Sequence, residues 1–268
     1  MAEHLGFNSD PTRPDPTRPH DRLTLEELAG SYNFANTSHR AVVFCRVVIE
    51  HARGLGGPVR ALDIGCGEGL GRKPAQTGWI KEAVDELWGI EPDASITPPE
   101  GMFDHFQHAL METAELPEGH FDIAYAYLVM EHVADPEGFF RAVHRALRPG
   151  GVFLFLTVNS SHYFTRIARA MHAARIDEKL LRLLRGRTLT DAYHYEVQYK
   201  CNSRQAIERV ARTTGFETPL IAFIEDHGPR GYLPGPLSVV YHAMNVKRRL
   251  VRRPEALLTV IARLRKPW

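Results

Sequence analysis

Asp63, Gly65, Gly67 and Gly69 lie close together and form the stretch of this sequence best suited to chemistry. Asp63 lies near the end of a short apolar run at 59–64, which predicts a buried strand, and the three glycines follow that run. Glycines at a strand end leave bare backbone at the carboxyl edge of a parallel sheet, where α/β proteins bind ligands. The carboxylate of Asp63 suits a ligand that carries an ammonium group. The stretch therefore predicts a ligand site at this edge.

The spacing of these glycines does not fit two common phosphate-binding motifs. A dinucleotide fingerprint GxGxxG would need glycine at position 70 or 72, where the chain has Leu70 and Arg72. The phosphate loop GxxxxGK[ST] fails as well, because no serine or threonine follows Lys73. A second carboxylate, Glu91, follows the next predicted strand at 86–90. In this position an acid can accept hydrogen bonds from both hydroxyls of a ribose.

Strand-like and helix-like segments alternate through most of the chain. Strands are predicted at 59–64, 86–90, 105–110, 121–128, 152–158, 217–224 and 256–264, although the last segment also fits a helix. Helical spacing is found at 24–51, at 136–147, at 161–185 and after Ser203, while 148–151 indicates a tight turn. Such alternation predicts an α/β fold, with a mainly parallel sheet covered by helices on both faces.

The composition narrows the class of protein. The 268 residues are 44% hydrophobic and 24% charged with a net charge of +1, which is typical of a globular chain and makes a nucleic-acid partner unexpected. Three cysteines, Cys45, Cys66 and Cys201, show no metal-like spacing and favour neither a disulfide framework nor a zinc ribbon. No uncharged apolar run approaches the ~18 residues of a membrane-spanning helix. The N-terminus lacks the apolar core of a signal peptide, so a cytoplasmic location is expected.

Four ordered stretches resemble class I S-adenosylmethionine-dependent methyltransferases, and the later stretches 195–203 and 215–217 resemble the type 11/12 branch of that family. The four ordered stretches are D-x-G-x-G-x-G from Asp63, the acid Glu91, the triplet Glu131-His132-Val133 and the run from Arg148 to Gly151. The resemblance covers residues 59–158. It implies a Rossmann-like sheet of seven strands, with S-adenosylmethionine as the methyl donor and S-adenosylhomocysteine as the product.

The resemblance also implies which loops hold the cofactor. The residues concerned are Asp63, Ile64, Gly65, Cys66, Gly67, Gly69, Glu91, Pro92, Thr113, Ala114, Glu115, Tyr127 and Leu128. The third loop departs from the family pattern, since Thr113 replaces the usual aspartate before the alanine. Some quinone-biosynthesis members bind a metal through an acid three residues before the Glu-His pair. Leu128 stands at that position here, so no metal site is expected.

The acceptor is expected over the same edge of the sheet, near 157–164 and 189–199. Methyl transfer is an in-line displacement, in which the enzyme mainly aligns the acceptor and excludes water. An oxygen acceptor also benefits from a base with a pKa near neutrality, such as histidine. His132 is the first candidate, followed by His162, Tyr163 and His194, although His132 also fits a purely structural role. The acceptor itself is expected to be a small molecule, a glycan or a lipid-linked intermediate, methylated at oxygen.

Four regions are predicted along the chain. A Pro-rich leader at 1–22 contains a repeated pentapeptide, a helical cap spans 23–58, the cofactor-binding core spans 59–160, and residues 161–268 form the substrate side of the same domain. The last region ends in a basic tail, 242–268, which suits either peripheral membrane contact or a solvated helix face. A catalytically silent binding module and a nicotinamide-dependent reductase are the alternatives, RNA methylation is less favoured, and the oligomeric state is left open.

Overall fold

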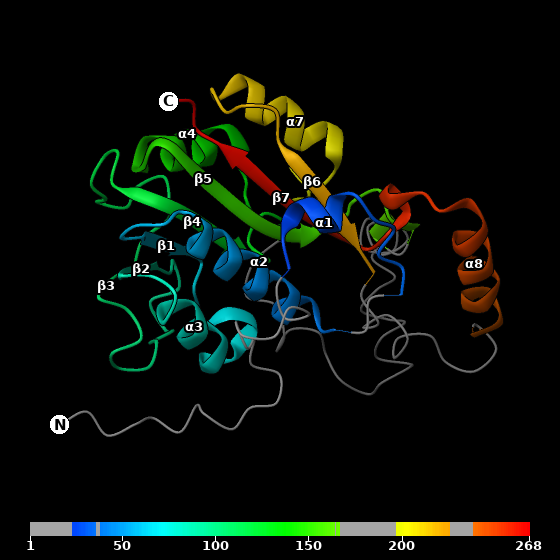
Figure 1. Cartoon of the computed structure of the whole chain (residues 1–268), viewed down its shortest axis with the longest axis horizontal. Coiled ribbons are helices and arrows are strands. Elements are labelled where there is room, and N and C mark those ends of the chain that lie inside the picture. Colours follow the sequence, from blue (N-terminus) through cyan, green and yellow to red (C-terminus); the bar gives the residue numbers. More distant parts are fainter. Residues whose placement is uncertain (1–22, 36–37, 164, 167–196, 226–237) are drawn as a thin grey trace.

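The computed structural model describes residues 23–35, 38–163, 165–166, 197–225 and 238–268, which build around one seven-stranded sheet (Figure 1). The strands lie in the order β3-β2-β1-β4-β5-β7-β6. Their bounds are β1 Arg60–Ile64, β2 Glu86–Ile90, β3 His105–Gln107, β4 Phe121–Tyr127, β5 Leu147–Val158, β6 Leu220–Ile224 and β7 Thr259–Arg265. Strands β1 to β5 pair in parallel, while β7 is antiparallel to both of its neighbours. The predicted α/β class and seven-stranded sheet are confirmed.

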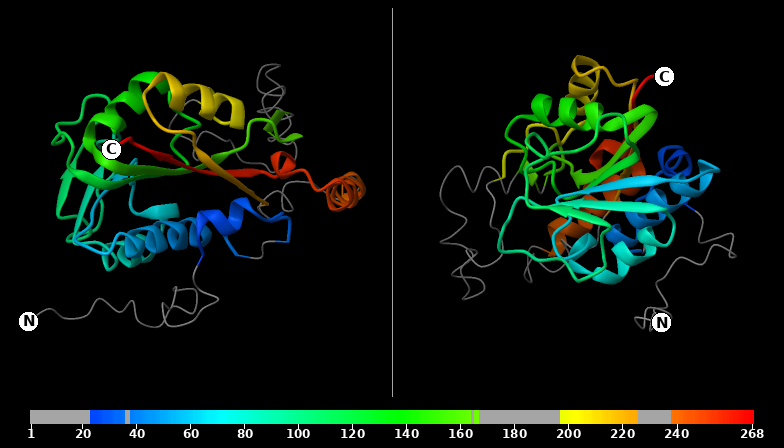
Figure 2. Two further views of the ribbon diagram at one scale, coloured as in Figure 1. Left: turned by 45° about the horizontal axis from the view of Figure 1, so that its top comes forward. Right: turned by 90° about the vertical axis from the view of Figure 1, so that its left-hand side faces the viewer.

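Helices cover both faces of this sheet (Figure 2). Helices α1 (Leu25–Ala29), α2 (Arg40–Gly54) and α3 (Pro74–Lys81) pack on one face, and α4 (Pro136–Ala146) and α7 (Arg204–Thr213) pack on the other. Helix α8 (Ser238–Val251) lies beyond the end of the sheet, and the short helices η3 (Leu70–Arg72) and η7 (Pro254–Ala256) complete the described elements. None of the described helices has the length and apolarity needed to cross a bilayer.

Strand β4 shows why the middle of the sheet is buried on both sides. Its side chains alternate between the two faces, as the two-residue period of a strand requires. Ile123 and Tyr125 join the apolar cluster under α2, whereas Ala124 and Ala126 join the cluster under α4. On the α4 side, the rings of Phe140 and Phe153 meet edge to face with centroids 5.6 Å apart. Strand β4 is therefore a rigid support for the loop that follows it.

One local prediction changes in the structure, and one open assignment is resolved. The run 148–151 is not a tight turn, because β5 already begins at Leu147 and its pairing with β4 shifts register between Phe121 and Ile123. Gly150, at φ +74°, lets the extended chain bend there without leaving the sheet. The segment whose class was left open, 256–264, contains strand β7. Most of the helix predicted at 161–185 and most of the acceptor segment 189–199, including His194, lie outside the described residues.

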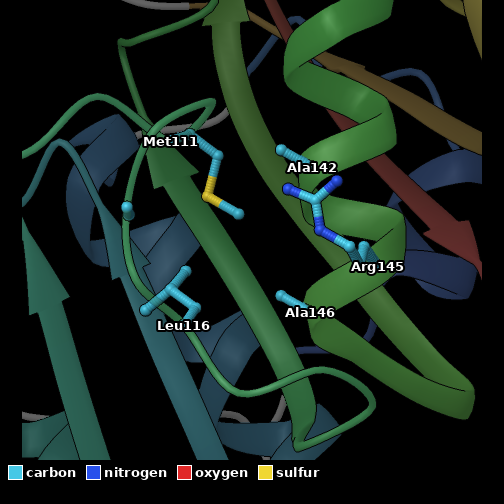
Figure 3. A pocket seen from close by; sticks show the side chains of 6 residues that line it. Met111, Leu116, Ala142, Arg145 and Ala146 are labelled. Atoms are coloured by element: carbon cyan, nitrogen blue, oxygen red, sulfur yellow. The ribbon is translucent and has the colours of Figure 1, made fainter.

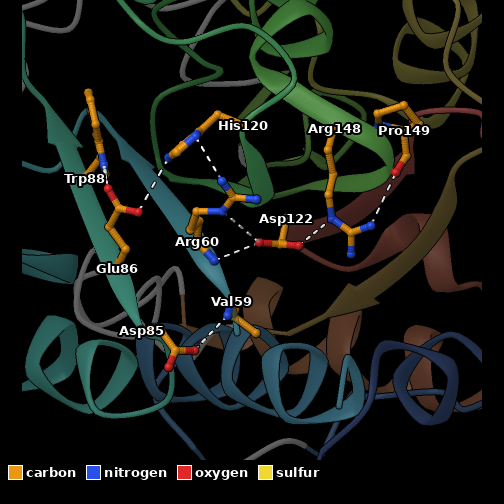
Figure 4. A network of polar contacts seen from close by, with 9 residues as sticks. All are labelled: Val59, Arg60, Asp85, Glu86, Trp88, His120, Asp122, Arg148 and Pro149. Atoms are coloured by element: carbon orange, nitrogen blue, oxygen red, sulfur yellow. Dashed lines mark hydrogen bonds and ion pairs between the residues drawn. The ribbon is translucent and has the colours of Figure 1, made fainter. Parts of the chain in front are cut away.

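A polar network fixes the strands at the amino edge of the sheet (Figure 4). The buried carboxylate of Asp122 accepts a hydrogen bond from the Arg60 backbone N–H at 2.8 Å and forms an ion pair with Arg148. Asp85 accepts from the Val59 N–H at 2.7 Å. These contacts hold β1, β4 and β5 in register at the end opposite to the glycine-rich loop.

Candidate functional site

The glycine-rich loop folds back onto the end of β2. The backbone N–H groups of Gly65 and Cys66 both donate to the Ile90 carbonyl, at 2.8 and 3.1 Å. The Gly67 N–H donates to Oε2 of Glu91 at 2.9 Å. The structure therefore brings together the loop and the acid that the sequence singled out separately.

Gly65 and Gly67 are required for different reasons. Both have positive φ, +67° and +53°, which favours glycine. A Cβ on Gly65 would lie 2.6 Å from Cγ2 of Val129, so the packing of Val129 also requires a residue without a side chain at this position. A Cβ on Gly67 would meet no atom within 4 Å, so this side of the loop is open. The open side is where a ligand can approach the backbone.

Asp63 lies at the same edge as a buried acid. Its side chain is 2% exposed, and Oδ2 has no hydrogen-bond partner among the described residues. Burial raises the pKa of Asp63 to about 8, with the neighbouring Tyr125 hydroxyl opposing this shift and the Glu91 carboxylate adding to it. The group is therefore mainly protonated at pH 7. A ligand ammonium would supply both the missing donor and the charge that favours ionisation.

Glu91 combines a structural contact with spare capacity. Its carboxylate, 4% exposed, accepts from the Gly67 N–H and from the Asp93 N–H at 3.0 Å. Each carboxylate oxygen can accept a second hydrogen bond, so two further donors, such as ribose hydroxyls, can be bound. Pro92 follows as an exposed residue.

The third predicted loop is fixed by a residue that the sequence reasoning missed. The side chain of Gln107, at the end of β3, accepts from the Glu115 N–H at 3.1 Å and donates to the Glu115 carbonyl at 2.8 Å. Thr113 and Glu115 are exposed, whereas Ala114 is half-buried. A polar residue at a strand end next to a predicted binding loop was the available signal for Gln107.

The other side of this loop is apolar and faces α4 (Figure 3). Met111 and Leu116 point toward Ala142 and Ala146 and line a cavity of about 30 Å³. This is room for about one water molecule, not for an adenine ring. The cavity therefore lies behind the loop, and its apolar side chains attach the loop to α4.

The end of β4 carries the next predicted residues. Tyr127 lies against α2, with its ring 6.0 Å from the ring of Phe44. The backbone of Leu128 adopts φ +56°, which is uncommon for a residue other than glycine. Its N–H donates to the Leu156 carbonyl at 2.9 Å. Ile64 is buried, as is the thiol of Cys66, whose pKa is raised by burial.

Glu131 and His132 follow β4 and differ in environment. Glu131 is buried, which raises the pKa of its carboxyl, and it accepts a hydrogen bond from the Thr157 hydroxyl at 2.9 Å. Thr157 in turn accepts from Nδ2 of the buried Asn202 at 2.5 Å. His132 is half-buried, and its backbone N–H donates to the Val129 carbonyl. The sequence reasoning placed Thr157 in the acceptor loop 157–164 but did not predict its contact with Asn202, which lies 45 residues further along the chain.

The Glu131 backbone also fixes a distant segment. Its carbonyl accepts hydrogen bonds from the N–H groups of Gln198 and Tyr199, at 2.7 and 3.1 Å. Together with the bond between Asn202 and Thr157, these contacts attach residues 198–202 to the carboxyl edge of the sheet. This places the end of the predicted acceptor segment 189–199 beside Glu131.

His162 and Tyr163 lie in a cluster around Arg248. Nη2 of Arg248 donates to the Tyr163 hydroxyl at 3.0 Å, and Nη1 forms a buried ion pair with Glu225. The guanidinium also lies over the rings of Phe34 and Tyr163, 5.4 and 5.2 Å from their centroids. Burial, and then Arg248, lowers the pKa of His162 to about 3. His162 is therefore neutral at pH 7 and a weak proton acceptor.

The cluster changes the interpretation of the basic tail. Arg248 is buried, Arg263 forms an ion pair with Glu26 at 2.6 Å, and Lys266 donates to the carbonyls of His144 and Leu147. These three cations serve internal contacts, whereas Lys247 and Arg249 are exposed, so only part of the basic tail faces solvent. The apolar residues that precede the tail, 232–237, lie outside the described part of the chain.

No group of three or more His, Cys, Asp or Glu within the described ranges is arranged to hold a metal ion. The absence of a metal site stays a prediction.

Comparisons with known proteins agree with this geometry. A family model described as a methyltransferase domain matches residues 36–218, more than half of the chain. The chain is 37% identical over 103 residues to a ubiquinone biosynthesis O-methyltransferase of Ruegeria pomeroyi, covering 38% of this chain and 42% of the relative. A protein of the same name from Caulobacter sp. is 36% identical over 122 residues, covering 44% and 46%. The matched part thus spans less than half the length of these curated relatives.

Solved structures show the same fold at low identity. A SAM-dependent methyltransferase of Archaeoglobus fulgidus superposes with a TM-score of 0.51 at 16% identity, covering 82% of this chain and 93% of that one. A Thermotoga maritima enzyme described as a possible histamine N-methyltransferase gives 0.50 at 16% identity, with coverage of 85% and 93%. The fold and the glycine-loop edge define a Rossmann-like ligand-binding protein. The chain belongs to the methyltransferase-domain family.

The open side of Gly67 generates a first prediction. Gly67→Ala and Gly119→Ala both place an alanine at positive φ, and neither Cβ would meet an atom within 4 Å. Each should lower the free energy of unfolding by about 1 kcal/mol. Only Gly67→Ala should weaken binding of S-adenosylhomocysteine, by roughly tenfold or about 1.4 kcal/mol, because its methyl group projects to the ligand side. Calorimetry and urea denaturation measure the two effects; equal affinities in both variants would contradict this assignment.

The raised pKa of Asp63 generates a second prediction. In the folded chain without ligand, Asp63 keeps its proton up to about pH 8, whereas in the unfolded chain it ionises near 3.8. The wild type therefore loses stability relative to Asp63→Asn as pH rises from about 4 to about 8, by about 1.4 kcal/mol per pH unit. Below and above this pH range, the difference in the free energy of unfolding between wild type and Asp63→Asn is constant. Urea denaturation at pH 5, 6 and 7 measures the slope.

Asp104→Asn is the matched control for this slope. Although burial raises the pKa of Asp104, hydrogen bonds from the Leu87 N–H and from Lys81 outweigh it and leave the pKa lowered. Asp104 thus titrates below pH 4, and its removal should leave the dependence between pH 5 and 7 unchanged. A wild-type slope equal to that of Asp63→Asn would show that Asp63 is ionised in the folded chain.

Proposed function

We propose that this methyltransferase transfers the methyl group to a hydroxyl oxygen of a small molecule, with the cofactor bound along the loops after β1, β2, β3 and β4. The observation that carries the cofactor placement is the buried, unpartnered Oδ2 of Asp63 beside the open side of Gly67. When bound, S-adenosylmethionine supplies an electrophilic methyl group on a sulfonium.

Each loop has a separate task in this proposal. Asp63 binds the ammonium of the amino-acid tail, while the backbone from Ile64 to Gly69 meets the rest of the tail. Glu91 accepts from the ribose hydroxyls, and the loop with Thr113, Ala114 and Glu115 lies against the adenine. Pro92, Tyr127 and Leu128 complete the walls. Hydrogen bonds hold two of these loops in place: the Gly67 N–H donates to Glu91, and the Glu115 backbone is hydrogen-bonded to the Gln107 side chain.

His132 is the better of the two histidines as a proton acceptor. A base for a hydroxyl works best with a pKa near the working pH. Burial leaves His162 with a pKa of about 3, whereas His132 is half-buried and follows directly on the strand that ends at the cofactor edge. We therefore assign proton removal to His132 and give Tyr163, held by Arg248, a place beside the acceptor.

The choice of oxygen rests on two supports. The curated relatives are named O-methyltransferases, and a histidine base is useful for a hydroxyl but not for the free electron pair of an amine. A panel of catechols and phenols, with matched anilines, tests this in an assay for S-adenosylhomocysteine release. Turnover of hydroxyl compounds alone is expected. Turnover of anilines alone would overturn the proposal, and a folded protein that binds no cofactor would favour the silent binding module.

The base assignment predicts the effect of His132→Gln. The substitution keeps a polar side chain but removes the basic nitrogen, so kcat on the hydroxyl substrate should fall by roughly 100-fold. The affinity for S-adenosylhomocysteine should stay within about twofold of wild type. His105→Gln, at the exposed amino end of β3, is the control and should keep full activity. Unchanged kcat and an unchanged pH profile in His132→Gln would give this residue a structural role.

We also propose that α8 contacts an anionic membrane surface, which would give the site access to lipid-linked acceptors. Among its described side chains, Val246, Leu250 and Val251 are exposed at 57%, 79% and 48%, and the exposed Lys247 and Arg249 lie between them. Leu250→Glu should reduce cosedimentation with phosphatidylglycerol vesicles. Leu110→Glu, an exposed leucine elsewhere, should not. Equal sedimentation of both variants would contradict this contact.

A further inference from the structure

Strand β7 carries two arginines on a face that is otherwise apolar. Alternate residues of this strand face opposite sides, and Val260, Ala262 and Leu264 join the core under α4 and α7. Ile261 joins the core under α1 and α2, so Arg263 and Arg265 continue that side of the strand. Arg263 lies between β5 and β6, and Arg265 follows two residues later, where β7 pairs with β5 alone. A cation in such a place needs an anionic partner.

The partner is present for one arginine only. Arg263 forms an ion pair with Glu26 at 2.6 Å. Arg265 is half-buried, and in the described part of the chain it makes no ion pair or hydrogen bond from its side chain. His51 lies close to both arginines, and its Nε2 is buried without a hydrogen-bond partner among the described residues. The Arg265 guanidinium thus lacks an acceptor among the described residues.

These groups line a cavity of about 440 Å³ between α1, α2 and the ends of β5 and β7. Leu55 and the indole of Trp268 supply accessible apolar surface, and the buried Leu25, Val47 and Leu154 lie beneath it. The other charged groups of the lining are already paired: Arg148 with Asp122, Glu26 with Arg263, and Glu50 with Arg53. The cavity therefore offers one unmatched cation against an apolar surface.

The cavity is separate from the cofactor edge. Arg148 is the second residue of the parallel strand β5, and Arg265 is the last residue of the antiparallel strand β7, so both mark the amino edge of the sheet. The cofactor loops follow the last residues of β1, β2 and β4, at the opposite edge.

We propose that this cavity binds a small organic carboxylate with an apolar body. Arg265 faces the carboxylate, and the body lies against Leu55 and the indole of Trp268. A bound carboxylate would join α1 and α2 to β7 through a ligand, next to the existing contact between Glu26 and Arg263. The site does not depend on the acceptor or on the cofactor placement proposed above.

The test uses 2-naphthoate as the probe and the full chain as the protein. Calorimetry should show saturable binding of one naphthoate per chain, with at least tenfold weaker binding of the neutral 2-naphthamide and of acetate, which lack the charge and the apolar body respectively. Arg265→Gln should weaken naphthoate binding at least tenfold, while Arg253→Gln, an exposed arginine outside the cavity, should leave it unchanged. Leu55→Trp, which fills the cavity from its rim and keeps Arg265, should also abolish binding.

Three results would overturn the proposal. They are the absence of saturable naphthoate binding by folded wild type, equal affinity of wild type and Arg265→Gln, and competition between naphthoate and S-adenosylhomocysteine. Thermal unfolding confirms that each variant is folded. Naphthoate affinity that is unchanged at saturating S-adenosylhomocysteine supports a separate site, whether or not the proposed acceptor chemistry holds.

Discussion

A protonated carboxyl at the end of β1 is the constraint on which the ligand edge depends. Asp63 is buried beside Glu91, with Tyr125 under it, and burial keeps it neutral in the absence of a partner. Two ionised carboxylates in this space would repel one another in a low dielectric. The Glu91 carboxylate accepts hydrogen bonds from the Gly67 and Asp93 N–H groups. The edge is thus prepared for one added cation, and the ammonium of an amino-acid tail supplies it.

The two edges of the sheet divide stability from function. At the amino edge, Asp122 and Asp85 accept hydrogen bonds from the start of β1, and the ion pair with Arg148 extends this contact to β5. At the carboxyl edge, the backbone takes up positive φ at Gly65, Gly67 and Leu128. Glycine adopts such a conformation readily, but Leu128 keeps it only because the surroundings hold it. The well-bonded amino edge and the doubly buried strands β1 and β4 supply that support.

Local patterns in the sequence predicted the core of this account. The spaced glycines after an apolar run, and the acid after the next run, indicated the loop and Glu91, because short-range order dictates both. The helix N-cap at Ser203 and the strand at 121–127 followed from equally local signals. The tight turn at 148–151 was wrong because proline and glycine signal a turn, while Gly150 in fact allows a bulge inside the strand.

The missed contacts are those that depend on the fold. Thr157 and Asn202 meet only because β5 ends beside the segment before α7, and Gln107 matters only because the loop returns to β3. The basic tail reads as a run of surface charge, yet Arg248 lies in a buried pair with Glu225, and Arg263 and Arg265 point inward from β7. No periodicity in one segment reveals a partner that another segment brings.

The most direct test of the central claim counts protons during cofactor binding. Binding of S-adenosylmethionine at pH 7 is measured by calorimetry in two buffers with different ionisation heats. If the ammonium converts Asp63 from its neutral to its charged form, close to one proton per chain is released in wild type and none in Asp63→Asn. Binding by wild type without proton release would show that Asp63 is already ionised or does not face the ammonium, and would contradict the account.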